Sequence, residues 1–548
     1  MPSTPAASEE ASGGGILLRI RSPKVAALTF SALMVITVPL VLWVLTPERW
    51  FELDEWYFVT GQTPTGPANL LTNHNGHWST VPRLVYHGLF YAFGLHAYRP
   101  YQVPTLVAHL AAVALIRVIL RRSGVSPWMA TLGAGTLLLF GPGAENISAP
   151  FQVSFTLTLV FGLGQLLLAD HDGAPDRRDL AALLLGLLTI MSSGLAFPML
   201  VATAVAIALR HRSPRVAGQR LAVQVGLPLL TFLVWRPLGG ETPAWPRPTV
   251  ATMFSWTTRQ VGATFSAMAG GTIVAGVLLA FVVAGPVLGW RRVGWRAVCD
   301  HQRLSIGTGA AALSFAVLTG TSRWFQGLEG AEVSRYLHVG ALLFLPALVV
   351  GMMEAAAAIP GTWRPRSLLL PAGAVVLLLA PALLNLGRFA PPLASPSIAA
   401  TIEYVAFAAP RSPVGATSPP WVTPIPDYSI VPFVTLGWLR EIDQAGMLPP
   451  APAPNRTLDD QMHVRLGLGQ RFAPTDRPCQ RTDGAVRVKP SVGDLWGFNV
   501  PVTIASVRSG VVDPAVAYTP ARGDQLEVLL SDLEFEVRPS GGAMTFCS

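Results

Sequence analysis

The sequence contains little charge. Asp, Glu, Lys and Arg make up 13% of its 548 residues, against about 25% in an average soluble domain. Hydrophobic residues of the AVILMFWYC set make up 51%. A soluble chain cannot bury so many, because a single interior stops growing at roughly 250–300 residues. The composition therefore excludes a soluble enzyme, a disordered chain and a coiled coil, and it predicts a polytopic membrane protein.

Lysine is almost absent, since only Lys24 and Lys489 stand against 37 arginines. Together with abundant Ala, Gly and Pro, this usage is typical of a GC-rich bacterial genome. We therefore expect the plasma membrane of an actinobacterium-like organism. The net charge of +8 divides into +11 for residues 1–400 and −3 for residues 401–548. Because the positive excess belongs to the hydrophobic part, it indicates topology, and we expect no nucleic acid as a partner.

Eleven apolar runs approach the length of about 17–25 residues that a bilayer requires. The first run is too long and too deep in the chain for a cleaved signal peptide, so it predicts a retained helix. The count is open by about two, because the third and fifth runs are short. The runs lie at 25–46, 103–120, 127–142, 150–169, 180–193, 195–209, 221–236, 272–290, 304–320, 336–353 and 367–386.

Positive charges gather in alternate loops. If the N-terminus is cytoplasmic, the short loops on that side hold seventeen positive charges and the longer loops on the other side hold eight. The positive-inside rule therefore predicts a cytoplasmic N-terminus and, after eleven crossings, an extracytoplasmic C-terminal domain. Cys479 and Cys547 then lie in an oxidising compartment, while Cys299 does not. This predicts a Cys479–Cys547 disulfide, with two free thiols as the alternative.

The membrane part has two long external loops. Residues 1–24 are expected to be a disordered cytoplasmic N-terminus, and residues 25–386 an all-α transmembrane domain. Its external loops lie at 47–102 and 237–270. The second loop is expected to hold an interfacial helix, because three aromatic side chains suit the membrane surface. These are Trp245, Phe254 and Trp256.

The C-terminal tail changes character along its length. Residues 387–461 are rich in proline and predict an extended extracytoplasmic linker, with a short helix at 435–447. Residues 462–548 alternate short apolar runs with Gly and Pro. This pattern predicts a small β-sandwich-like domain.

An acidic pair, Asp54-Glu55, follows the first apolar run within an aromatic segment. Carboxylates are costly at a membrane surface unless a cation or a metal compensates them, so the pair is a candidate site. The alternative is that the acids only solvate the end of a helix.

The same loop contains Asn73-His74-Asn75-Gly76-His77-Trp78, with Arg83 a few residues later. Imidazole and carboxylate groups both bind metals, but no specific zinc signature is present. The alternative is a loop whose histidines simply form hydrogen bonds. We take Asn75, His77 and Arg83 as candidate binding residues.

Two further polar groups fall on the same predicted side of the membrane. Glu145 and Asn146 occupy the turn between the third and fourth apolar runs, and Gln152 lies about one and a half helical turns further. A Gly-Pro-Gly turn with a capping Asn146 explains that turn without any function, but it explains Glu145 less well. Arg335-Tyr336 opens a late run, with Arg323 upstream. An arginine there suits a phosphate, although it also suits a snorkelling interfacial residue.

This layout resembles the GT-C-fold integral membrane glycosyltransferases across the whole membrane region. The shared features are Asp54-Glu55 after the first helix, the long first external loop, the Arg335-Tyr336 helix start and an external C-terminal domain. The pair is Asp-Glu where the family more often has Asp-Asp. A second resemblance, to a group of actinobacterial membrane proteins, lies in Asn75-Gly76-His77-Trp78 to Pro82, Gly143-Ala144-Glu145-Asn146 and Phe151-Gln152.

The GT-C resemblance implies an inverting enzyme that transfers a sugar from a polyprenyl-phosphate donor to a cell-envelope glycan or glycolipid. It implies that Asp54 is the general base. The leaving lipid phosphate would be neutralised by Arg335, or by Arg323. The resemblance also implies that Asp54, Glu55 and Glu145 orient the acceptor or bind a divalent cation, Mg or Mn. Asn75 and His77 would contact sugar hydroxyls.

Other functions suit parts of the same pattern. A transporter or lipid-linked saccharide flippase would also carry polar residues in a helical bundle, although the acids here lie at the rim rather than at mid-span. A non-enzymatic envelope scaffold that binds through its tail is a further alternative, as are acyl or phosphoglycerol transferases.

Overall fold

The computed structural model describes two compact units. The helical unit comprises residues 22–46, 70–82 and 101–389, and the second unit comprises residues 50–69, 83–100 and 403–547. The predicted N-terminus up to residue 21, Trp245, most of the run at 367–386 and most of the linker lie outside the described residues. Those described are 22–46, 50–51, 54–63, 66–67, 69–240, 247–358, 373, 379–389, 403–412, 415–416, 420, 424, 434–450, 453 and, from 468 to 547, the strands with their short turns at 483–485, 500, 540 and 542–543.

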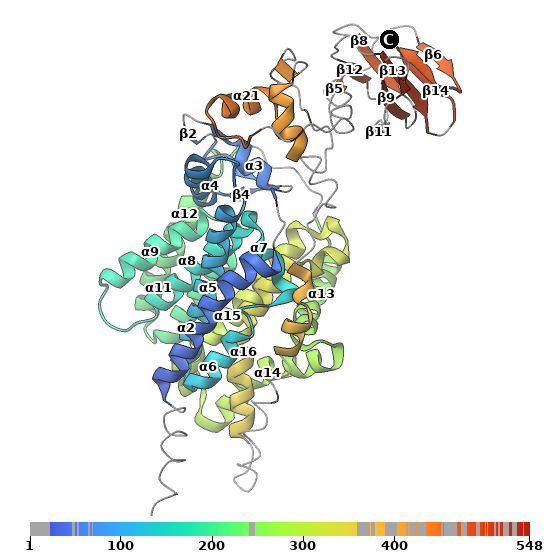
Figure 1. Ribbon diagram of the computed structural model, residues 1–548. Helices are drawn as coiled ribbons and strands as arrows, with labels where there is room; N and C mark the ends of the chain where they lie inside the picture. The colour runs from blue at the N-terminus through green and yellow to red at the C-terminus, as the bar shows by residue number, and fades with distance from the viewer. Residues whose placement is uncertain are drawn as a thin grey trace, which may run out of the picture. The chain divides into compact units, whose positions relative to one another are not determined.

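Seven helices among the described residues are long and apolar enough to cross a membrane, and each overlaps one of the predicted runs (Figure 1). The predicted multi-pass helical membrane protein is therefore confirmed. The seven are α2 (Pro23–Pro39) with η1 (Leu40–Leu45), α5 (Arg99–Arg122), η3 (Pro150–Gln152) with α8 (Val153–Ala169), α11 (Pro214–Leu221) with η4 (Ala222–Gly226) and α12 (Leu227–Trp235), α14 (Thr272–Val293), α15 (Trp295–Ser322) and α16 (Ser334–Ala357).

Three further predicted runs form shorter helices. They are α6 (Pro127–Gly135), α9 (Arg177–Ile190) and α10 (Ala196–Arg210). Side chains cap two of them: Asp176 forms a capping box at the start of α9, and Ser126 caps α6 ahead of a proline. The expected total of about eleven spans stays a prediction, because these helices have fewer than 18 residues.

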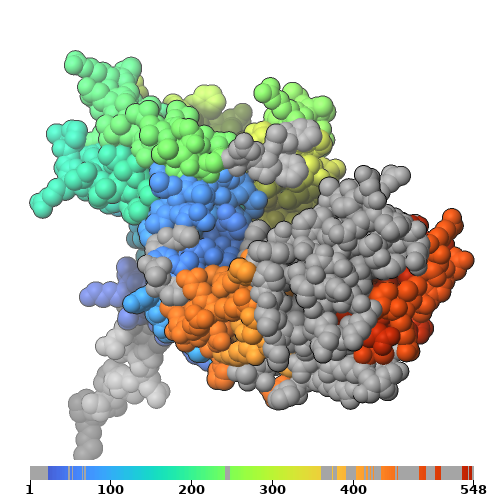
Figure 2. All heavy atoms as spheres, turned by 90° about the horizontal axis from the view of Figure 1, so that it is seen from above, coloured from blue at the N-terminus to red at the C-terminus, as the bar shows by residue number. Residues whose placement is uncertain are grey.

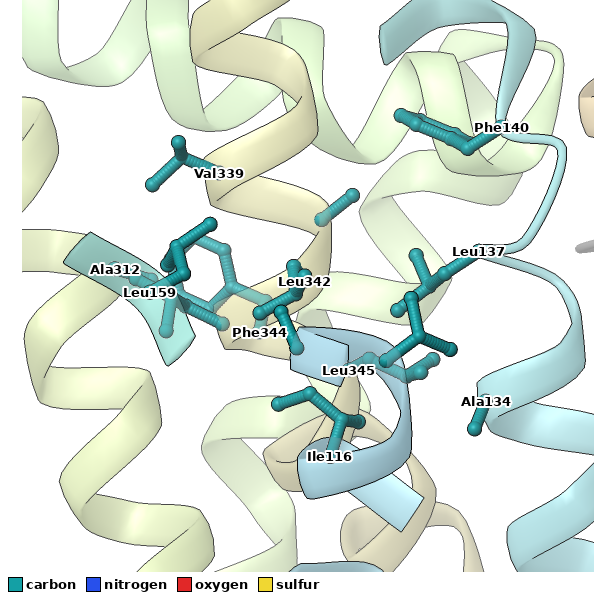
Figure 3. Close-up of a cluster of buried hydrophobic side chains, with 14 of the residues drawn as sticks. Ile116, Ala134, Leu137, Phe140, Leu159, Ala312, Val339, Leu342, Phe344 and Leu345 are labelled. Carbon is teal, nitrogen blue, oxygen red and sulfur yellow. The ribbon is translucent and has the colours of Figure 1, made fainter. Parts of the chain in front are cut away.

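The core of the helical unit lies where α5, α8, α15 and α16 meet. Ile116, Leu159, Ala312 and Leu342 are buried at this junction, one from each helix (Figure 3). Outside it, α10 packs against α15 and α8, and α14 packs against α16. Apolar side chains on several faces of these helices explain why hydropathy alone located them.

The prediction of an interfacial helix is right about the helix but wrong about its surroundings. A 20-residue helix, α13 (Val250–Ala269), does occupy the second external loop, and Phe254 on it is exposed. However, α13 packs against α14, α15 and α16, and Trp256 is completely buried. The Trp256 indole N–H donates to Gln260 at 3.0 Å and to Thr319 at 3.1 Å, so an internal polar partner replaces the membrane surface that we expected.

The second unit joins the first external loop to part of the linker. Here α3 (Asp54–Thr60), the β1–β2 hairpin (Gln62–Thr63 and Gly66–Pro67) and part of α4 (Thr80–Phe93) accompany α21 (Leu436–Gln444). Trp438 on α21 stacks on Phe90 and donates its indole N–H to the Gln62 carbonyl at 2.8 Å. Seen from above, orange residues of 403–450 lie beside blue residues of the first loop (Figure 2).

The C-terminal strands are present as predicted. They form two antiparallel five-stranded sheets, in the order β10-β9-β13-β7, with β11 also paired to β9, and in the order β5-β12-β8-β14-β6. The strands are β5 (Leu468–Phe472), β6 (Cys479–Thr482), β7 (Val486–Val488), β8 (Asp494–Phe498), β9 (Val502–Arg508), β10 (Val511–Val512), β11 (Val516–Tyr518), β12 (Gln525–Val528), β13 (Glu534–Pro539) and β14 (Met544–Cys547).

The register of β14 on β6 places Cys547 directly opposite Cys479. Cα atoms of opposed residues in an antiparallel pair lie about 4.5–5.5 Å apart, which is within the range of about 4.4–6.8 Å that a disulfide spans. The backbone is therefore compatible with the Cys479–Cys547 bridge, which stays a prediction.

Candidate functional site

A polar cluster gathers where α16 begins, at one corner of the helical unit. Arg335 donates from Nη1 to Glu145 Oε1 at 3.0 Å, and Gln152 donates from Nε2 to the same oxygen at 2.6 Å. The Arg335 guanidinium lies over the Tyr336 ring at 5.3 Å from its centroid. The structure therefore brings together two polar groups that the sequence had identified separately. Part of the snorkelling interpretation holds, since Arg335 does lie beside an aromatic, but it also has an acidic partner.

The turn that carries Glu145 is shaped by close approach to α16. Gly141–Gly143 form the 3-10 turn η2, and Ala144–Ser148 form the short helix α7. A Cβ on Gly143 would lie 2.7 Å from the Cβ of His338, so only glycine fits there. The Glu145 N–H donates to the Ser334 hydroxyl at 3.2 Å, which fixes the acid against the start of α16.

Asn146 does not cap the turn, as the non-functional interpretation supposed. Its Nδ2 donates to the Arg335 carbonyl at 3.0 Å and contacts His338 Nδ1 at 3.2 Å. His338 Nε2 lies 3.0 Å from His109 Nδ1, and His109 Nε2 lies 3.4 Å from the Leu138 carbonyl. Because the Asn146 amide nitrogen can only donate and the Leu138 carbonyl can only accept, each imidazole donates from Nε2 and accepts at Nδ1, so both rings are neutral.

Sequence reasoning missed this histidine chain. A usable signal was present, because His109 and His338 both interrupt apolar runs, and polar residues within membrane spans are uncommon and often functional. Both side chains are buried. Among the described residues, the buried amide oxygens of Asn146 and Gln152 accept no hydrogen bond. The corner therefore offers unused acceptors close to Glu145.

The first external loop contributes a hairpin rather than a helix face. Strands β3 (Asn73–His74) and β4 (His77–Trp78) pair through an Asn75-Gly76 turn, in which both residues have positive φ. Asn-Gly favours this turn. Asn75 lies exposed at the tip, and the His74 ring contacts Phe151, the neighbour of Gln152, at 5.4 Å.

His77 and Arg323 meet beside the hairpin. The Gly194 N–H donates to His77 Nδ1 at 3.2 Å, and Arg323 Nη2 lies 3.3 Å from Nε2. Burial, then the charge of Arg323 and the nearby His74, lowers the pKa of His77 from 6.5 to about 3. A guanidinium can only donate and a neutral imidazole has one acceptor nitrogen, so His77 accepts from either Gly194 or Arg323. Arg323 therefore places a guanidinium beside a neutral imidazole, which suits a phosphate or hydroxyl oxygen.

Three predicted site residues belong to the second unit. Glu55 is buried, and the Tyr98 hydroxyl lies 3.1 Å from each of its oxygens. Asp54, in the first turn of α3, is partly exposed. Arg83 is buried, donates from Nη2 to the Tyr57 hydroxyl at 3.3 Å and stacks over the Tyr57 ring. Arg83 therefore packs against α3, and Asp54 is the more exposed of the two acids.

These residues fit a divalent cation poorly. Hard cations such as Mg²⁺ prefer several oxygen ligands and retain waters, whereas Glu55 is enclosed beside Phe51 and Tyr98. Among the described residues, three potential metal ligands converge only at His171, Asp176 and Asp179. Arg220 already donates to Asp179 there at 3.0 Å. The divalent cation at Asp54 and Glu55 stays a prediction, and we derive no step through it.

The fold and the corner cluster define a multi-pass helical membrane protein with a polar site at one end of its helical unit. No protein-family model matches the sequence, and no curated protein matches it. The chain is similar to the crystal structure of ArnT from Cupriavidus metallidurans bound to undecaprenyl phosphate, at 14% identity and a TM-score of 0.44, over 76% of this chain and 84% of that one. At such low similarity, function is inferred below from this chain's own residues.

Proposed function

We propose that this protein is an integral membrane glycosyltransferase of the GT-C type. It transfers a sugar from a polyprenyl-phosphate donor to a cell-envelope glycan or glycolipid on the extracytoplasmic face, with inversion at the anomeric carbon. The observation that carries the proposal is the pairing of Arg335 with Glu145 and Gln152 at the start of α16.

The phosphate of a phospho-sugar needs hydrogen-bond donors and its sugar hydroxyls need acceptors, and the helical unit supplies both. Arg335 and Arg323 are donors, and they suit a lipid phosphate whose negative charge grows as it leaves. Glu145 is an acceptor, and so are the unpaired amide oxygens of Asn146 and Gln152, which suit sugar hydroxyls. A site for a simple anion would not need these acceptors.

In this proposal Asp54 removes the proton from the acceptor hydroxyl. The hydroxyl oxygen forms a bond to the anomeric carbon from the face opposite the phosphate. The bond between that carbon and the phosphate oxygen breaks, and its electron pair leaves with the polyprenyl phosphate. Glu55 is enclosed and hydrogen-bonded to Tyr98, so its role is to hold the start of α3 rather than to accept the proton.

The replacement Asp54→Asn tests this role in a transfer assay that uses purified protein, a panel of polyprenyl-phosphate-linked pentoses and hexoses, and envelope glycan as the acceptor. We expect transfer to fall at least about 100-fold, because general base catalysis contributes about 10²–10⁴-fold. The thermal unfolding midpoint should stay unchanged, since Asp54 is partly exposed.

The matched control is Asp443→Asn, which removes a carboxylate of the same unit that bonds Arg411 at 3.0 Å. It should retain full transfer. A fully active Asp54→Asn variant would contradict the role of Asp54 as the base.

A lipid-linked saccharide flippase or transporter is the second candidate, and the His109–His338 pair within the bundle favours it. Ionisable residues inside a membrane often mark transport pathways. The hydrogen bonds of this pair run in one direction from Asn146 to Leu138, however, and both rings are neutral. The pair therefore stiffens the contact between α5 and α16 without carrying a charge.

A further inference from the structure

A second polar cluster lies at the other end of α8, about 26 Å along the helix from Gln152 at a rise of about 1.5 Å per residue. Asp170 follows α8 directly, and its side chain is almost fully buried. Arg210 reaches it at 2.8 Å, Arg303 at 2.5 Å and Arg122 at 4.0 Å. These arginines come from α10, α15 and α5, so one carboxylate gathers three guanidinium groups from three helices.

The cluster surrounds a cavity of about 430 Å³. Its lining includes Arg122, Arg178, Arg210 and Arg303, against the carboxylates of Asp170 and Asp172, so the lining carries a charge of +2 with histidine neutral. The hydrogen bond from Arg210 lowers the pKa of Asp172, which keeps that acid charged. Even if Asp176, bonded to Arg178 at 2.7 Å, is counted as well, one positive charge remains.

Arg122 is the arginine of this lining that lies farthest from its carboxylate partner, since Asp170 is 4.0 Å away. The Arg122 side chain is 45% exposed. Among the described residues it donates at hydrogen-bond distance only to the Leu167 carbonyl, at 2.7 Å. A guanidinium carries five N–H donors, so most of those on Arg122 remain available beside the cavity.

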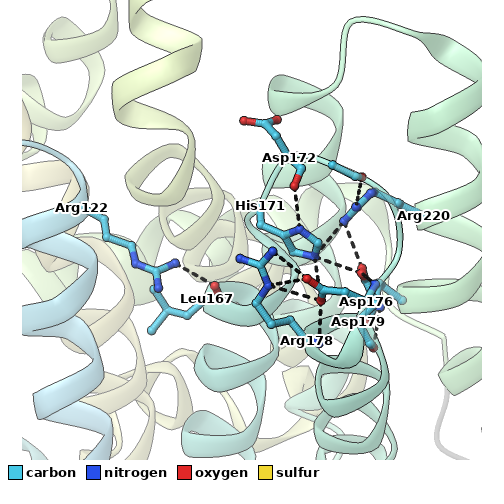
Figure 4. A network of polar contacts seen from close by, with 10 residues as sticks. Arg122, Leu167, His171, Asp172, Asp176, Arg178, Asp179 and Arg220 are labelled. Atoms are coloured by element: carbon cyan, nitrogen blue, oxygen red, sulfur yellow. Dashed lines mark hydrogen bonds and ion pairs between the residues drawn. The ribbon is translucent and has the colours of Figure 1, made fainter.

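The neighbouring loop explains why the cavity keeps its shape. Arg220 donates to Asp179 and to the Gly173 carbonyl, both at 3.0 Å, and His171 Nε2 lies 3.0 Å from Asp179 (Figure 4). Since a guanidinium already lies beside His171 and Asp179, these residues act as a brace. They hold the loop after α8 and are not a metal site.

We propose that this cavity binds a phosphate-bearing anion, and that the phosphate of an anionic phospholipid headgroup is its source. Arginine forks match phosphate oxygens, and basic pockets between membrane helices bind anionic headgroups. The candidate spans α5 and α8 both end beside the cavity, which places it at a membrane surface. Leu167 and Leu168 line it as well and provide an apolar wall for an acyl chain. The site is separate from the proposed transfer site.

The test measures binding to the full-length protein in detergent by native mass spectrometry. The probes are phosphatidylglycerol, phosphatidylcholine and inorganic phosphate. We expect phosphatidylglycerol to remain bound, and Arg122→Gln to weaken its apparent affinity about tenfold, since hydrogen bonds to charged groups are among the strong ones. Arg122→Lys should weaken it less, because it keeps the charge and loses the fork. Arg212→Gln removes an exposed arginine outside the lining and should have no effect.

Each outcome decides the proposal. Preference for phosphatidylglycerol over phosphatidylcholine, with a loss in Arg122→Gln alone, supports it in full. Displacement of that lipid by millimolar inorganic phosphate supports the phosphate site and assigns free phosphate as its ligand. Equal retention of both lipids, or equal loss in Arg122→Gln and Arg212→Gln, overturns it. The thermal unfolding midpoint of each variant shows whether it is folded. If Arg122→Gln is misfolded, the loss of phosphatidylglycerol binding is judged from Arg122→Lys instead.

Discussion

At the scale of single residues, Glu145 and Arg335 connect the fold to the proposed chemistry. They lie 190 positions apart in sequence and meet because Gly143 lets the turn approach α16 closely. The pair is only partly buried, with side-chain exposures of 15% and 31%. A partly exposed ion pair contributes little to stability, so function explains its presence better than stability does.

Replacement of Arg335 separates the two explanations. We expect Arg335→Ala to lower transfer by about 10²–10³-fold, the usual cost of removing one donor to a developing charge. The double variant Glu145→Gln/Arg335→Ala removes the uncompensated carboxylate and should recover any lost thermal stability while transfer stays low. Recovery of transfer in the double variant would show that the pair is only structural.

His77 gives the protein a defined pH response. Because its pKa is lower in the folded protein, about 3, than its ordinary value of 6.5, the unfolded chain binds more protons between these values. The stability contributed by this residue is therefore present above about pH 6.5 and is lost as the pH falls toward 3. We expect the unfolding midpoint to drop more between pH 7.5 and pH 5 for the wild type than for His77→Gln. Identical pH profiles would contradict the depressed pKa.

At the scale of elements, seven of the eleven predicted apolar runs overlap candidate spans among the described residues, because long apolar helices are visible to hydropathy. They did not predict that α13 packs inside the bundle, with Gln260 and Thr264 buried beside Trp256. When polar side chains form hydrogen bonds with one another inside a bundle, the sequence of a buried helix has the polar pattern of a surface helix. The pairing of His77 with Arg323 was invisible for a similar reason, since it joins segments 246 positions apart.

Close packing of α14 on α16 depends on two glycines. A Cβ on Gly285 would lie 2.5 Å from the Cα of Gly351, and small residues of this kind let membrane helices approach. We expect Gly285→Val to lower the free energy of unfolding by about 1–3 kcal/mol, the usual cost of overpacking. The control Gly276→Val lies on the same helix, where an added Cβ has no neighbour within 4 Å. Equal thermal shifts for the two variants would argue against the contact.

At the scale of the whole molecule, the sparse charges divide into two groups of different use. Acids and amides meet Arg335 at one end of α8, and arginines surround Asp170 at the other. Sequence reasoning found the first group from its acids but counted Arg122 and Arg210 only as markers of topology. It could not do otherwise, because the cavity exists only once α5, α8, α10 and α15 have packed. The orientation in the membrane stays a prediction.

The central claim is that the protein moves a sugar off its lipid, and a doubly labelled donor tests it most directly. Purified protein in lipid nanodiscs receives a polyprenyl-phosphate sugar with ³²P in the phosphate and ¹⁴C in the sugar, together with envelope glycan as the acceptor. The proposal predicts that the labels separate, with ¹⁴C passing to the glycan and ³²P staying with the lipid, and that Asp54→Asn prevents this. If the labels stay together in active protein, while the same lipid crosses the bilayer of proteoliposomes, the protein is a flippase and the glycosyltransferase proposal is contradicted.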